Sequence, residues 1–262
     1  MSAATANERR VALISGAASG IGAATARRFV REGWDVAINH LDASQHAAAQ
    51  ALVASASAPG QRALAIEGDV TRDADCVRLV DTAVRSLGRL DVLVNAAGIS
   101  KMVAHPRLHD VSAEDFQRIY AVNVIGAFQM VRAFAPLLGR QPGAAIVNVS
   151  SIAALMGTGS SLAYMASKGA LNALTIGLAR SLGPAIRVNA IAPGLVETPW
   201  LQKGHGAEKY AAMVDAYRAR SALDAVIAPE DVAEAAWFLG VTAAKTTGEV
   251  LLVDAGVRLT RG

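Results

Sequence analysis

The chain has a single cysteine, Cys76, among its 262 residues, so no disulfide can form within it. With 53% hydrophobic and only 18% charged residues it can bury a large core without cross-links, and a reducing compartment is the simplest expectation. No apolar run approaches the roughly 20 residues that a membrane helix needs. The N-terminal stretch MSAATANERR also lacks the apolar centre of a signal peptide. We therefore expect a cytoplasmic protein without a membrane partner.

Charge of either sign is thinly spread. The 25 lysines and arginines nearly balance the 22 aspartates and glutamates, which leaves a net charge of +3. Aromatic residues make up 5% of the chain, and no basic run is interleaved with them. Proteins that bind nucleic acid usually concentrate positive charge on one face or along one helix. We therefore expect no nucleic-acid partner, and we also expect no metal site.

Seven short apolar runs rich in β-branched residues recur along the chain. They cover residues 11–15, 35–39, 63–66, 90–95, 144–150, 186–192 and 248–254. Near-continuous apolar strands are typical of a sheet buried on both faces, and strands that alternate with helical segments form right-handed βαβ units. The sequence therefore predicts one α/β domain over residues 1–262. We expect a doubly wound, Rossmann-type, seven-stranded parallel sheet flanked by helices on both faces.

The segment 199–225 breaks the alternation of strands and helices. It follows an apolar run and contains no clear strand of its own. Two interpretations fit this pattern: an excursion over the surface, or a lid that covers a pocket at the carboxyl ends of the strands.

A glycine-rich stretch, VALISGAASGIG, joins the first apolar run to an alanine-rich segment. Gly16 permits a tight turn, Gly20 lets the backbone approach a pyrophosphate, and Gly22 allows a helix to pack closely on the strand. A helix that starts here presents free N–H groups and the positive end of its dipole. Because a strand precedes the glycines and a helix follows them, the stretch predicts a dinucleotide site rather than a plain turn.

The glycine spacing, with Ser15 before it, resembles the fingerprint of the short-chain dehydrogenase/reductase family, in which threonine usually takes the place of Ser15. The resemblance covers nearly the whole chain, through GDV (68–70), NAAG (95–98), VNVIGAF (122–128), VNVSS (147–151), YMASK (164–168), APGLVETP (192–199) and VDAG (253–256). The last motif usually reads Val-Asp-Gly-Gly, so Ala255 is a departure. The resemblance implies an NAD(P)-dependent oxidoreductase that interconverts a carbonyl and a secondary alcohol. It also favours the lid interpretation of 199–225, because the family keeps its substrate loop there.

The resemblance implies four catalytic residues. Tyr164 would be the general acid/base, Ser151 would hold the substrate oxygen, and Asn123 would support a water chain toward Lys168. Lys168 would bind the nicotinamide ribose. Because it lies one helical turn from Tyr164, we also expect it to lower the pKa of the phenol from an ordinary value of about 10. The intervening residues 165–167 are interpreted as helix filler.

The same resemblance implies a set of cofactor contacts from the ends of several strands. The expected residues are Gly16, Ser19, Gly20, Ile21, Gly22, Asn39, His40, Asp69, Val70, Asn95, Ala96, Ala97, Gly98, Tyr164, Lys168, Pro193, Gly194, Val196 and Thr198.

The choice of nicotinamide cofactor depends on the end of the second strand. His40 occupies the place that discriminates between cofactors in the family, and Asn39 followed by a non-acidic residue resembles NADP-preferring members. Asp42 lies at about the distance at which an acid binds the ribose hydroxyl of NAD. We favour NADP and keep NAD as the alternative.

The substrate is expected to be a small molecule. The chain resembles the 3-oxoacyl-carrier-protein reductases, but Arg132 and Arg140 are a thin basic cluster for an acidic carrier, so a small or medium carbonyl or secondary alcohol is the safer expectation. Two alternatives are a non-catalytic nucleotide-sensing regulator and a structural subunit that binds cofactor incidentally. The presence of all four catalytic residues disfavours the regulator. By resemblance to the family we expect a homotetramer, with a dimer next.

Overall fold

The computed structural model describes residues 9–56, 58–138, 141–199 and 206–259. Seven strands form one sheet in the order β3-β2-β1-β4-β5-β6-β7, and every neighbouring pair is parallel. The strands are β1 (Val11–Ser15), β2 (Asp35–His40), β3 (Ala63–Glu67), β4 (Val92–Asn95), β5 (Ala145–Val149), β6 (Arg187–Pro193) and β7 (Val250–Val253). Each strand lies within or overlaps one of the seven apolar runs, so the predicted fold class is confirmed.

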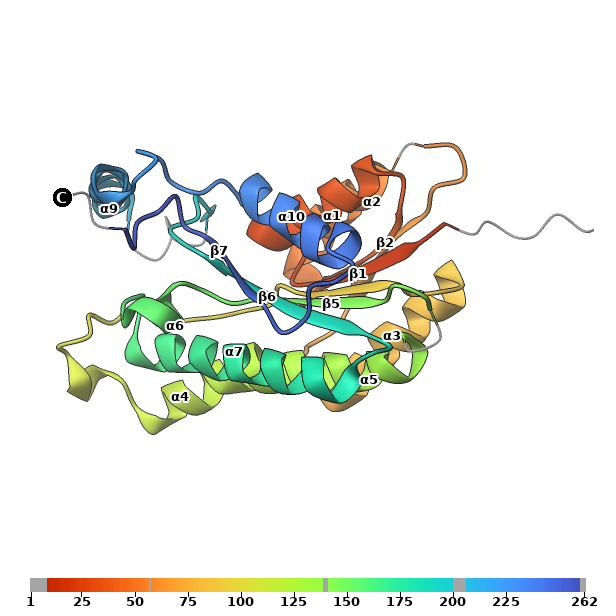
Figure 1. Cartoon of the computed structure of the whole chain (residues 1–262), viewed down its shortest axis with the longest axis horizontal. Coiled ribbons are helices and arrows are strands. Elements are labelled where there is room, and N and C mark those ends of the chain that lie inside the picture. The colour runs from red at the N-terminus through yellow and green to blue at the C-terminus, as the bar shows by residue number, and fades with distance from the viewer. Residues whose placement is uncertain (1–8, 57, 139–140, 200–205, 260–262) are drawn as a thin grey trace, which may run out of the picture.

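Helices cover both faces of the sheet (Figure 1). One layer contains α1 (Gly20–Arg31), α2 (His46–Ala54) and α10 (Pro229–Trp237), and the other contains α3 (Asp73–Leu87), α5 (Ala127–Leu138) and α7 (Leu162–Leu182). Neighbouring residues of one strand point into different layers. Ile14 packs in the core that includes Phe29 of α1, whereas Leu13 packs in the core that includes Phe134 of α5. This two-sided burial explains why the strands read as continuous apolar runs.

The remaining helices and helical turns lie mainly around the carboxyl ends of the strands. They are η1 (Ala43–Gln45), η2 (Leu108–Asp110), α4 (Ala113–Tyr120), the π-helical turn η3 (Ala121–Gly126), α6 (Ala153–Met156), α9 (Ala207–Arg220) and the π-helical turn η4 (Phe238–Thr242). Helix α9 occupies most of the segment that breaks the sequence pattern, and residues 200–205 lie outside the described part. None of the helices in the described ranges is long and apolar enough to cross a lipid bilayer.

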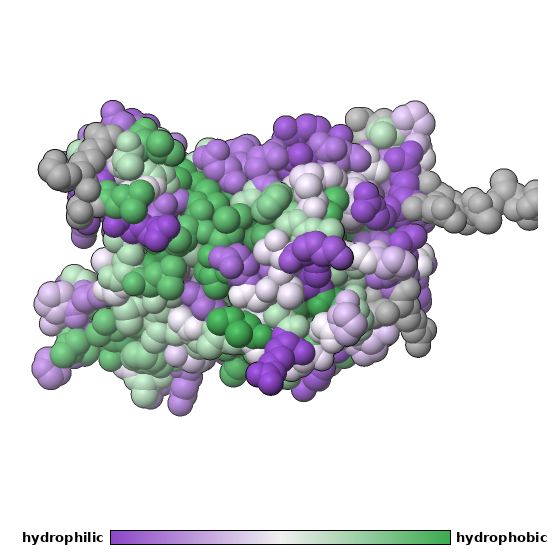
Figure 2. Space-filling model, in the orientation of Figure 1, coloured by the Kyte–Doolittle hydropathy of each residue, from purple (hydrophilic) through white to green (hydrophobic). Residues whose placement is uncertain are grey.

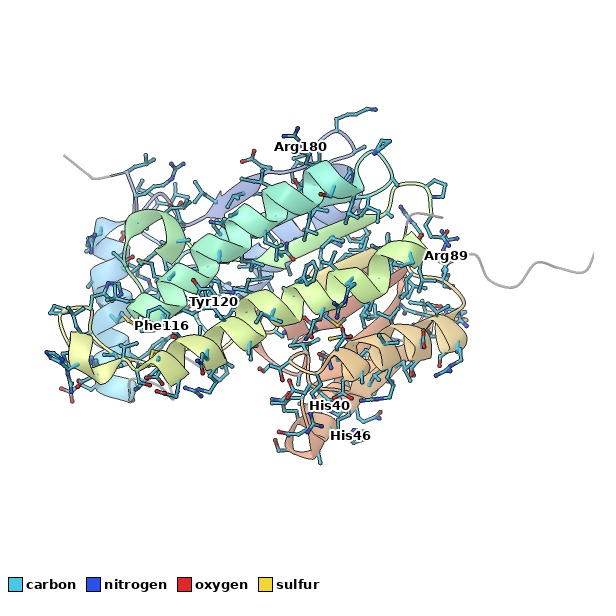
Figure 3. The ribbon with its side chains drawn as sticks, turned by 90° about the horizontal axis from the view of Figure 1, so that it is seen from below. His40, His46, Arg89, Phe116, Tyr120 and Arg180 are labelled. Atoms are coloured by element: carbon cyan, nitrogen blue, oxygen red, sulfur yellow. The ribbon has the colours of Figure 1, made fainter. Side chains whose placement is uncertain are left out.

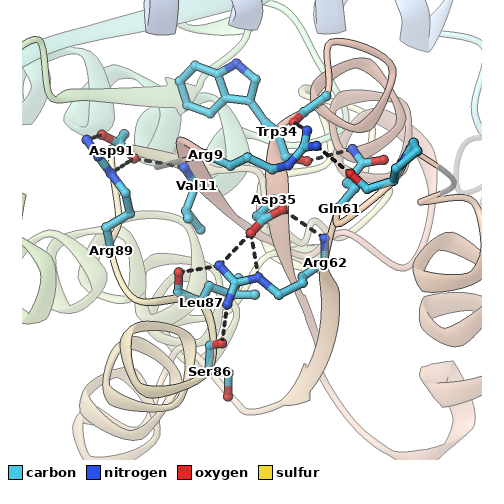
Figure 4. A network of polar contacts seen from close by, with 12 residues as sticks. Arg9, Val11, Trp34, Asp35, Gln61, Arg62, Ser86, Leu87, Arg89 and Asp91 are labelled. Atoms are coloured by element: carbon cyan, nitrogen blue, oxygen red, sulfur yellow. Dashed lines mark hydrogen bonds and ion pairs between the residues drawn. The ribbon is translucent and has the colours of Figure 1, made fainter. Parts of the chain in front are cut away.

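The amino ends of the strands carry buried carboxylates that accept hydrogen bonds from main-chain N–H groups and from arginine side chains (Figure 4). Asp35 has no exposed surface and accepts hydrogen bonds from the main-chain N–H and the Nε of Arg62, both at 2.8 Å. Arg62 also donates to the Leu87 carbonyl oxygen at 2.8 Å, which ties the start of β3 to the end of α3. Asp91 accepts from the Val11 N–H at 2.8 Å and from Arg89 at 2.6 Å. These pairs stabilise the end of the sheet at which the strands begin. The opposite end, where the strands finish, is free to form a site.

Ala255 adopts a left-handed backbone conformation, with φ of +51°. Its carbonyl oxygen accepts a hydrogen bond from the Leu223 N–H at 3.1 Å, so the conformation is fixed by a neighbouring segment. A side chain at positive φ is strained, which explains why the family motif usually has glycine at this position.

The variant Ala255→Gly is therefore expected to increase the free energy of unfolding by about 0.5–1 kcal/mol, because relief of strain exceeds the added freedom of the unfolded chain. Chemical denaturation measures the change. The matched control is Ala48→Gly at an exposed position of α2, which should lower stability by about 0.5–1 kcal/mol. Equal losses in both variants would contradict the strain at Ala255.

Candidate active site

A cavity of about 1210 Å³ opens at the carboxyl edge of the sheet. Its walls come from the glycine loop, the ends of β4, β5 and β6, the loop after β4, and helices α4, α7 and α9. The sheet order places β2 and β4 on either side of β1, so the chain crosses to opposite faces of the sheet at this point. Ligands of open α/β sheets bind in the crevice at such a switch point. All the expected cofactor contacts except His40 and Asn95 line the cavity.

The glycine loop lies directly on neighbouring backbone. A Cβ atom at Gly16, where φ is +61°, would lie 2.7 Å from the Cα of Ala97, and one at Gly22 would lie 2.4 Å from the carbonyl oxygen of Gly16. A Cβ atom at Gly20 would lie 3.3 Å from the side chain of Thr198. The Ser19 side chain makes no capping hydrogen bond at the start of α1, and the first turn has no acidic residue. No side-chain cap and no carboxylate of the first turn therefore competes for the N–H groups at the start of α1.

Two polar side chains hold the loop in place. The Asn39 Oδ1 accepts from the Gly16 N–H at 3.2 Å, and its Nδ2 donates to the Gly68 carbonyl oxygen at 2.9 Å. Asn39 lines the cavity, but its amide is committed to these main-chain bonds. The Ser15 hydroxyl accepts from the N–H groups of Ala96 and Ala97 at 3.1 and 3.2 Å, which joins β1 to the end of β4.

His40 and Asp42, two of the residues expected to decide between NADP and NAD, do not line the cavity. His40 is buried, and its ring contacts the Asp42 carbonyl oxygen at 3.0 Å and the His46 ring at 3.3 Å (Figure 3). Asp42 accepts a hydrogen bond from the Ser44 N–H at 2.9 Å. Leu41 and Gln45 line the cavity in their place. Sequence reasoning missed both, because the direction of each side chain depends on the turn after β2.

Asn95 is also buried away from the cavity. Its Nδ2 donates to the Asn148 Oδ1 at 2.9 Å, and Asn148 in turn donates to the Thr175 hydroxyl at 2.9 Å. These contacts join β4, β5 and α7 beneath the cavity floor. Asn95 therefore stabilises the strand ends, and its main-chain neighbour Ala96 supplies the cavity wall instead.

Tyr164 and Ser151 meet on the cavity wall. Their hydroxyl groups are hydrogen-bonded, and the Ser151 Oγ also accepts from the Ala153 N–H at 3.1 Å. Burial raises the pKa of the Tyr164 phenol, and the hydrogen bond with Ser151 opposes this shift. The expectation that Lys168 lowers the pKa of Tyr164 is therefore wrong for this structure, because loss of solvation outweighs the other influences.

Lys168 is only 4% exposed, and its ammonium group points back to the sheet. The Nζ donates to the Val149 carbonyl oxygen at 2.7 Å and lies 5.7 Å from the centre of the Tyr164 ring. Burial lowers the pKa of Lys168 to about 8. Loss of solvation thus shifts both Tyr164 and Lys168 toward their uncharged forms.

Asn123 lies in the π-helical turn η3 and does not line the cavity. Its Oδ1 accepts from the Ile99 N–H at 2.9 Å, and its Nδ2 donates to the Ile99 carbonyl oxygen and to the Ser167 hydroxyl, both at 3.0 Å. A Cβ atom built on Gly98 would lie 3.5 Å from the Asn123 Oδ1 and 3.6 Å from the Lys168 Nζ. Both polar atoms are therefore close to Gly98.

Three comparisons with known proteins agree on the family. The family model for enoyl-(acyl carrier protein) reductase matches residues 16–258. The granaticin polyketide synthase ketoacyl reductase 2 of Streptomyces violaceoruber is 44% identical over 257 residues, which cover 98% of this chain and 99% of that protein. The chain belongs to the short-chain dehydrogenase/reductase family. It is an NAD(P)-dependent oxidoreductase that acts on a small-molecule substrate.

Solved structures give the same result. A short-chain dehydrogenase/reductase from Burkholderia xenovorans superposes with a TM-score of 0.89 at 41% identity, over 97% of this chain and 100% of that one. A blue fluorescent protein from a metagenomic library, in complex with NADPH, superposes with a TM-score of 0.83 at 34% identity, over 95% and 97% of the two chains.

In this short-chain dehydrogenase/reductase, Ser167 is more than helix filler, which corrects the sequence interpretation. It is fully buried, donates to the Tyr164 carbonyl oxygen at 2.7 Å and accepts from Asn123. The hydroxyl therefore connects η3 to the helix that bears Tyr164 and Lys168. Helical spacing alone does not distinguish a buried serine from an exposed one, so no sequence signal identified it.

Tyr217 is a second residue that the sequence did not reveal. Its hydroxyl donates to the Asp254 carbonyl oxygen at 2.7 Å and accepts from the main chain of Leu195. A Cβ atom at Gly194 would lie only 1.9 Å from this hydroxyl, so glycine is required there. Burial raises the pKa of Tyr217 to about 12, so it stays a neutral donor. The contact anchors α9 on the strand ends that border the cavity.

The lowered pKa of Lys168 has a measurable consequence. Between pH 8 and 10 the unfolded chain holds a proton on this lysine that the native state releases, so native stability should rise with pH by about 2 kcal/mol through this group. We expect the stability of the wild type relative to Lys168→Met to rise by this amount over that range, as measured by denaturant unfolding. The exposed Lys245→Met variant is the control and should show no such trend. A constant difference between wild type and Lys168→Met would contradict the lowered pKa.

Proposed function

We propose that the cavity catalyses the reversible reduction of a carbonyl to a secondary alcohol, with Tyr164 as the general acid/base. The observation that carries the proposal is the hydrogen-bonded pair of Tyr164 and Ser151, beside buried Lys168, in the same cavity as the glycine loop. The pair offers two hydroxyl groups to one substrate oxygen.

The cavity walls fit a nicotinamide dinucleotide. The side-chain-free surface of Gly16 and Gly20 and the start of α1 suit a pyrophosphate, and Val70 and Ala97 border the same cavity nearer β3 and β4. Lys168 would hold the ribose, and Thr198, in the segment after β6, would hold the carboxamide. When bound, the cofactor supplies the hydride.

The protein's own task is to deliver a proton to the substrate oxygen. The phenol of Tyr164 is protonated near neutral pH, so it can donate a proton to a carbonyl oxygen. Oxidation of an alcohol needs the phenolate instead, so this direction should gain rate at higher pH. Lys168, with its pKa of about 8, can gain or lose a proton at a pH close to that value. The hydrogen bond between Asn123 and Ser167 joins the turn η3 to helix α7, which bears Tyr164 and Lys168.

Removal of the phenol hydroxyl tests the mechanism. Tyr164→Phe should lower kcat by about 10²- to 10⁴-fold, because it removes the proposed proton donor, whereas cofactor affinity should change little. The measurements are absorbance of the reduced cofactor with a panel of carbonyls, and cofactor binding by calorimetry.

The matched control is Tyr120→Phe, which removes a hydroxyl from a tyrosine outside the cavity lining and should preserve activity. Activity of Tyr164→Phe at the wild-type level would contradict the assignment. Tight cofactor binding by the wild type without turnover of any carbonyl would favour the nucleotide-sensing regulator.

We also propose that the enzyme prefers NADP over NAD. Two observations support this preference. The carboxylate of Asp42 is engaged with Ser44 and does not line the cavity, so no acid of the β2 turn opposes a phosphate there. In addition, a structural relative binds NADPH.

We expect a kcat/KM for NADPH several-fold above that for NADH. Gln45→Glu places a negative charge on the cavity wall and should lower kcat/KM for NADPH about tenfold through charge repulsion, with little effect on NADH. Gln50→Glu, an exposed position outside the cavity lining, is the control. A preference for NADH that does not respond to Gln45→Glu would show that the cofactor is NAD.

The relative from Streptomyces violaceoruber has ketoacyl reductase in its name, which supports a 3-oxoacyl thioester as one candidate substrate. We further propose a homotetramer. Large apolar side chains on α4, η3, α5 and α7 remain exposed in the single chain, namely Phe116, Ile125, Phe128 and Ile176. Contact between copies would bury them. A monomer mass in light scattering would contradict this assembly.

A further inference from the structure

Helix α9 presents a continuous face to the cavity. Lys209, Met213 and Tyr217 all line it, and their spacing of four residues places them on one side of the helix. Figure 1 shows α9 on one side of the sheet and α4 on the other, at the same end of the molecule. Figure 2 shows apolar surface concentrated at this end. Helix α9 therefore forms one wall of the cavity, along which Lys209, Met213 and Tyr217 follow one another.

The position of this wall is fixed at one end. Tyr217 is anchored through its hydroxyl to Asp254 and to Leu195, next to the segment that follows β6. Lys209 lies two turns away, about 12 Å along the helix axis, with Met213 between them. A molecule that lies along α9 would therefore meet apolar contacts first and a cation at its far end. Met102, Val103 and Leu195 add further apolar side chains to the same cavity lining.

The charges on the cavity wall are unbalanced. Lys209 is exposed and forms no ion pair within the described part of the chain. Arg118, on α4, also lines the cavity, and its carboxylate contact is a long one of 3.8 Å to Asp115. Asp115 is already held by Lys101 at 2.6 Å. Asp69 is the sole carboxylate found among the described lining residues, and it accepts hydrogen bonds from Thr71 near β3.

We propose that the enzyme selects substrates with an anionic group remote from the reacting carbonyl, and that Lys209, assisted by Arg118, binds this group. The proposal rests on the proposed function, because it places the carbonyl at Tyr164. An apolar spacer of several carbon atoms would lie along Met213. The anion is either the carboxylate of a free oxo acid or the phosphate of a coenzyme A thioester, which offer the same charge to Lys209.

Two matched pairs of substrates test the proposal. The first pair is 7-oxooctanoate and its methyl ester, and the second is acetoacetyl-coenzyme A and the N-acetylcysteamine thioester of acetoacetate. In at least one pair, the charged member should have the higher kcat/KM, and Lys209→Gln should reduce that advantage about three- to fivefold, as expected for a solvent-exposed ion pair. Lys209→Glu should reduce it further, and added salt should weaken it in the wild type. The pair that responds identifies the source of the anion.

The exposed Lys245→Gln variant is the control, because it removes the same charge outside the cavity lining and should leave both ratios unchanged. For each variant, turnover of the uncharged member is the reference against which turnover of the charged member is compared. Turnover of both pairs without any dependence on Lys209 would overturn the proposal and leave the proposed function intact.

A binding measurement distinguishes failure of the proposed function from failure of the proposed anion subsite. If no carbonyl is reduced, the proposed function fails, but calorimetric titration of 7-oxooctanoate and of coenzyme A into the protein saturated with oxidised cofactor still tests the subsite. Weaker binding of either anion to Lys209→Gln than to Lys245→Gln would support the proposal. Equal binding of both anions to the two variants would overturn it.

Discussion

The rest of the site depends on one close contact, in which the glycine loop after β1 packs against the main chain that follows β4. Gly16 lies so close to Ala97, and Gly22 so close to Gly16, that no side chain fits at either glycine. This approach lets the Ser15 hydroxyl reach the N–H groups at the end of β4 and lets Asn39 hold the loop from β2. A side chain at either position would lift the loop, move the start of α1 and fill the cavity floor.

Burial rather than charge pairing governs the candidate catalytic groups. Tyr164 and Lys168 lie one helical turn apart, and the ammonium group of Lys168 donates to the Val149 carbonyl oxygen. Desolvation raises the pKa of one and lowers that of the other, so both are biased toward neutral forms. A neutral, protonated phenol can donate a proton, and its hydrogen bond with Ser151 fixes its position on the cavity wall.

The substrate side of the site depends on contacts between segments far apart in the chain. Tyr217 of α9 reaches both the turn after β6 and the end of β7, at a point where only glycine fits beneath its hydroxyl. A shift of α9 would therefore disturb the segment that contains Val196 and Thr198. The fold in this way couples the wall that faces the substrate to the wall assigned to the nicotinamide.

Several features followed from the sequence because they depend on short stretches of chain. The seven strands reflect local periodicity, and the glycine loop is a short local pattern. Ser151, Tyr164 and Lys168 follow from the resemblance to the family, and the structure places these three candidate residues together. Other features depend on tertiary contacts. His40 turned away from the cavity, Ser167 became part of a network with Asn123, and Tyr217 became the anchor of α9. Their partners lie in other elements, and the direction of a side chain is set by what packs around it, which no local pattern encodes.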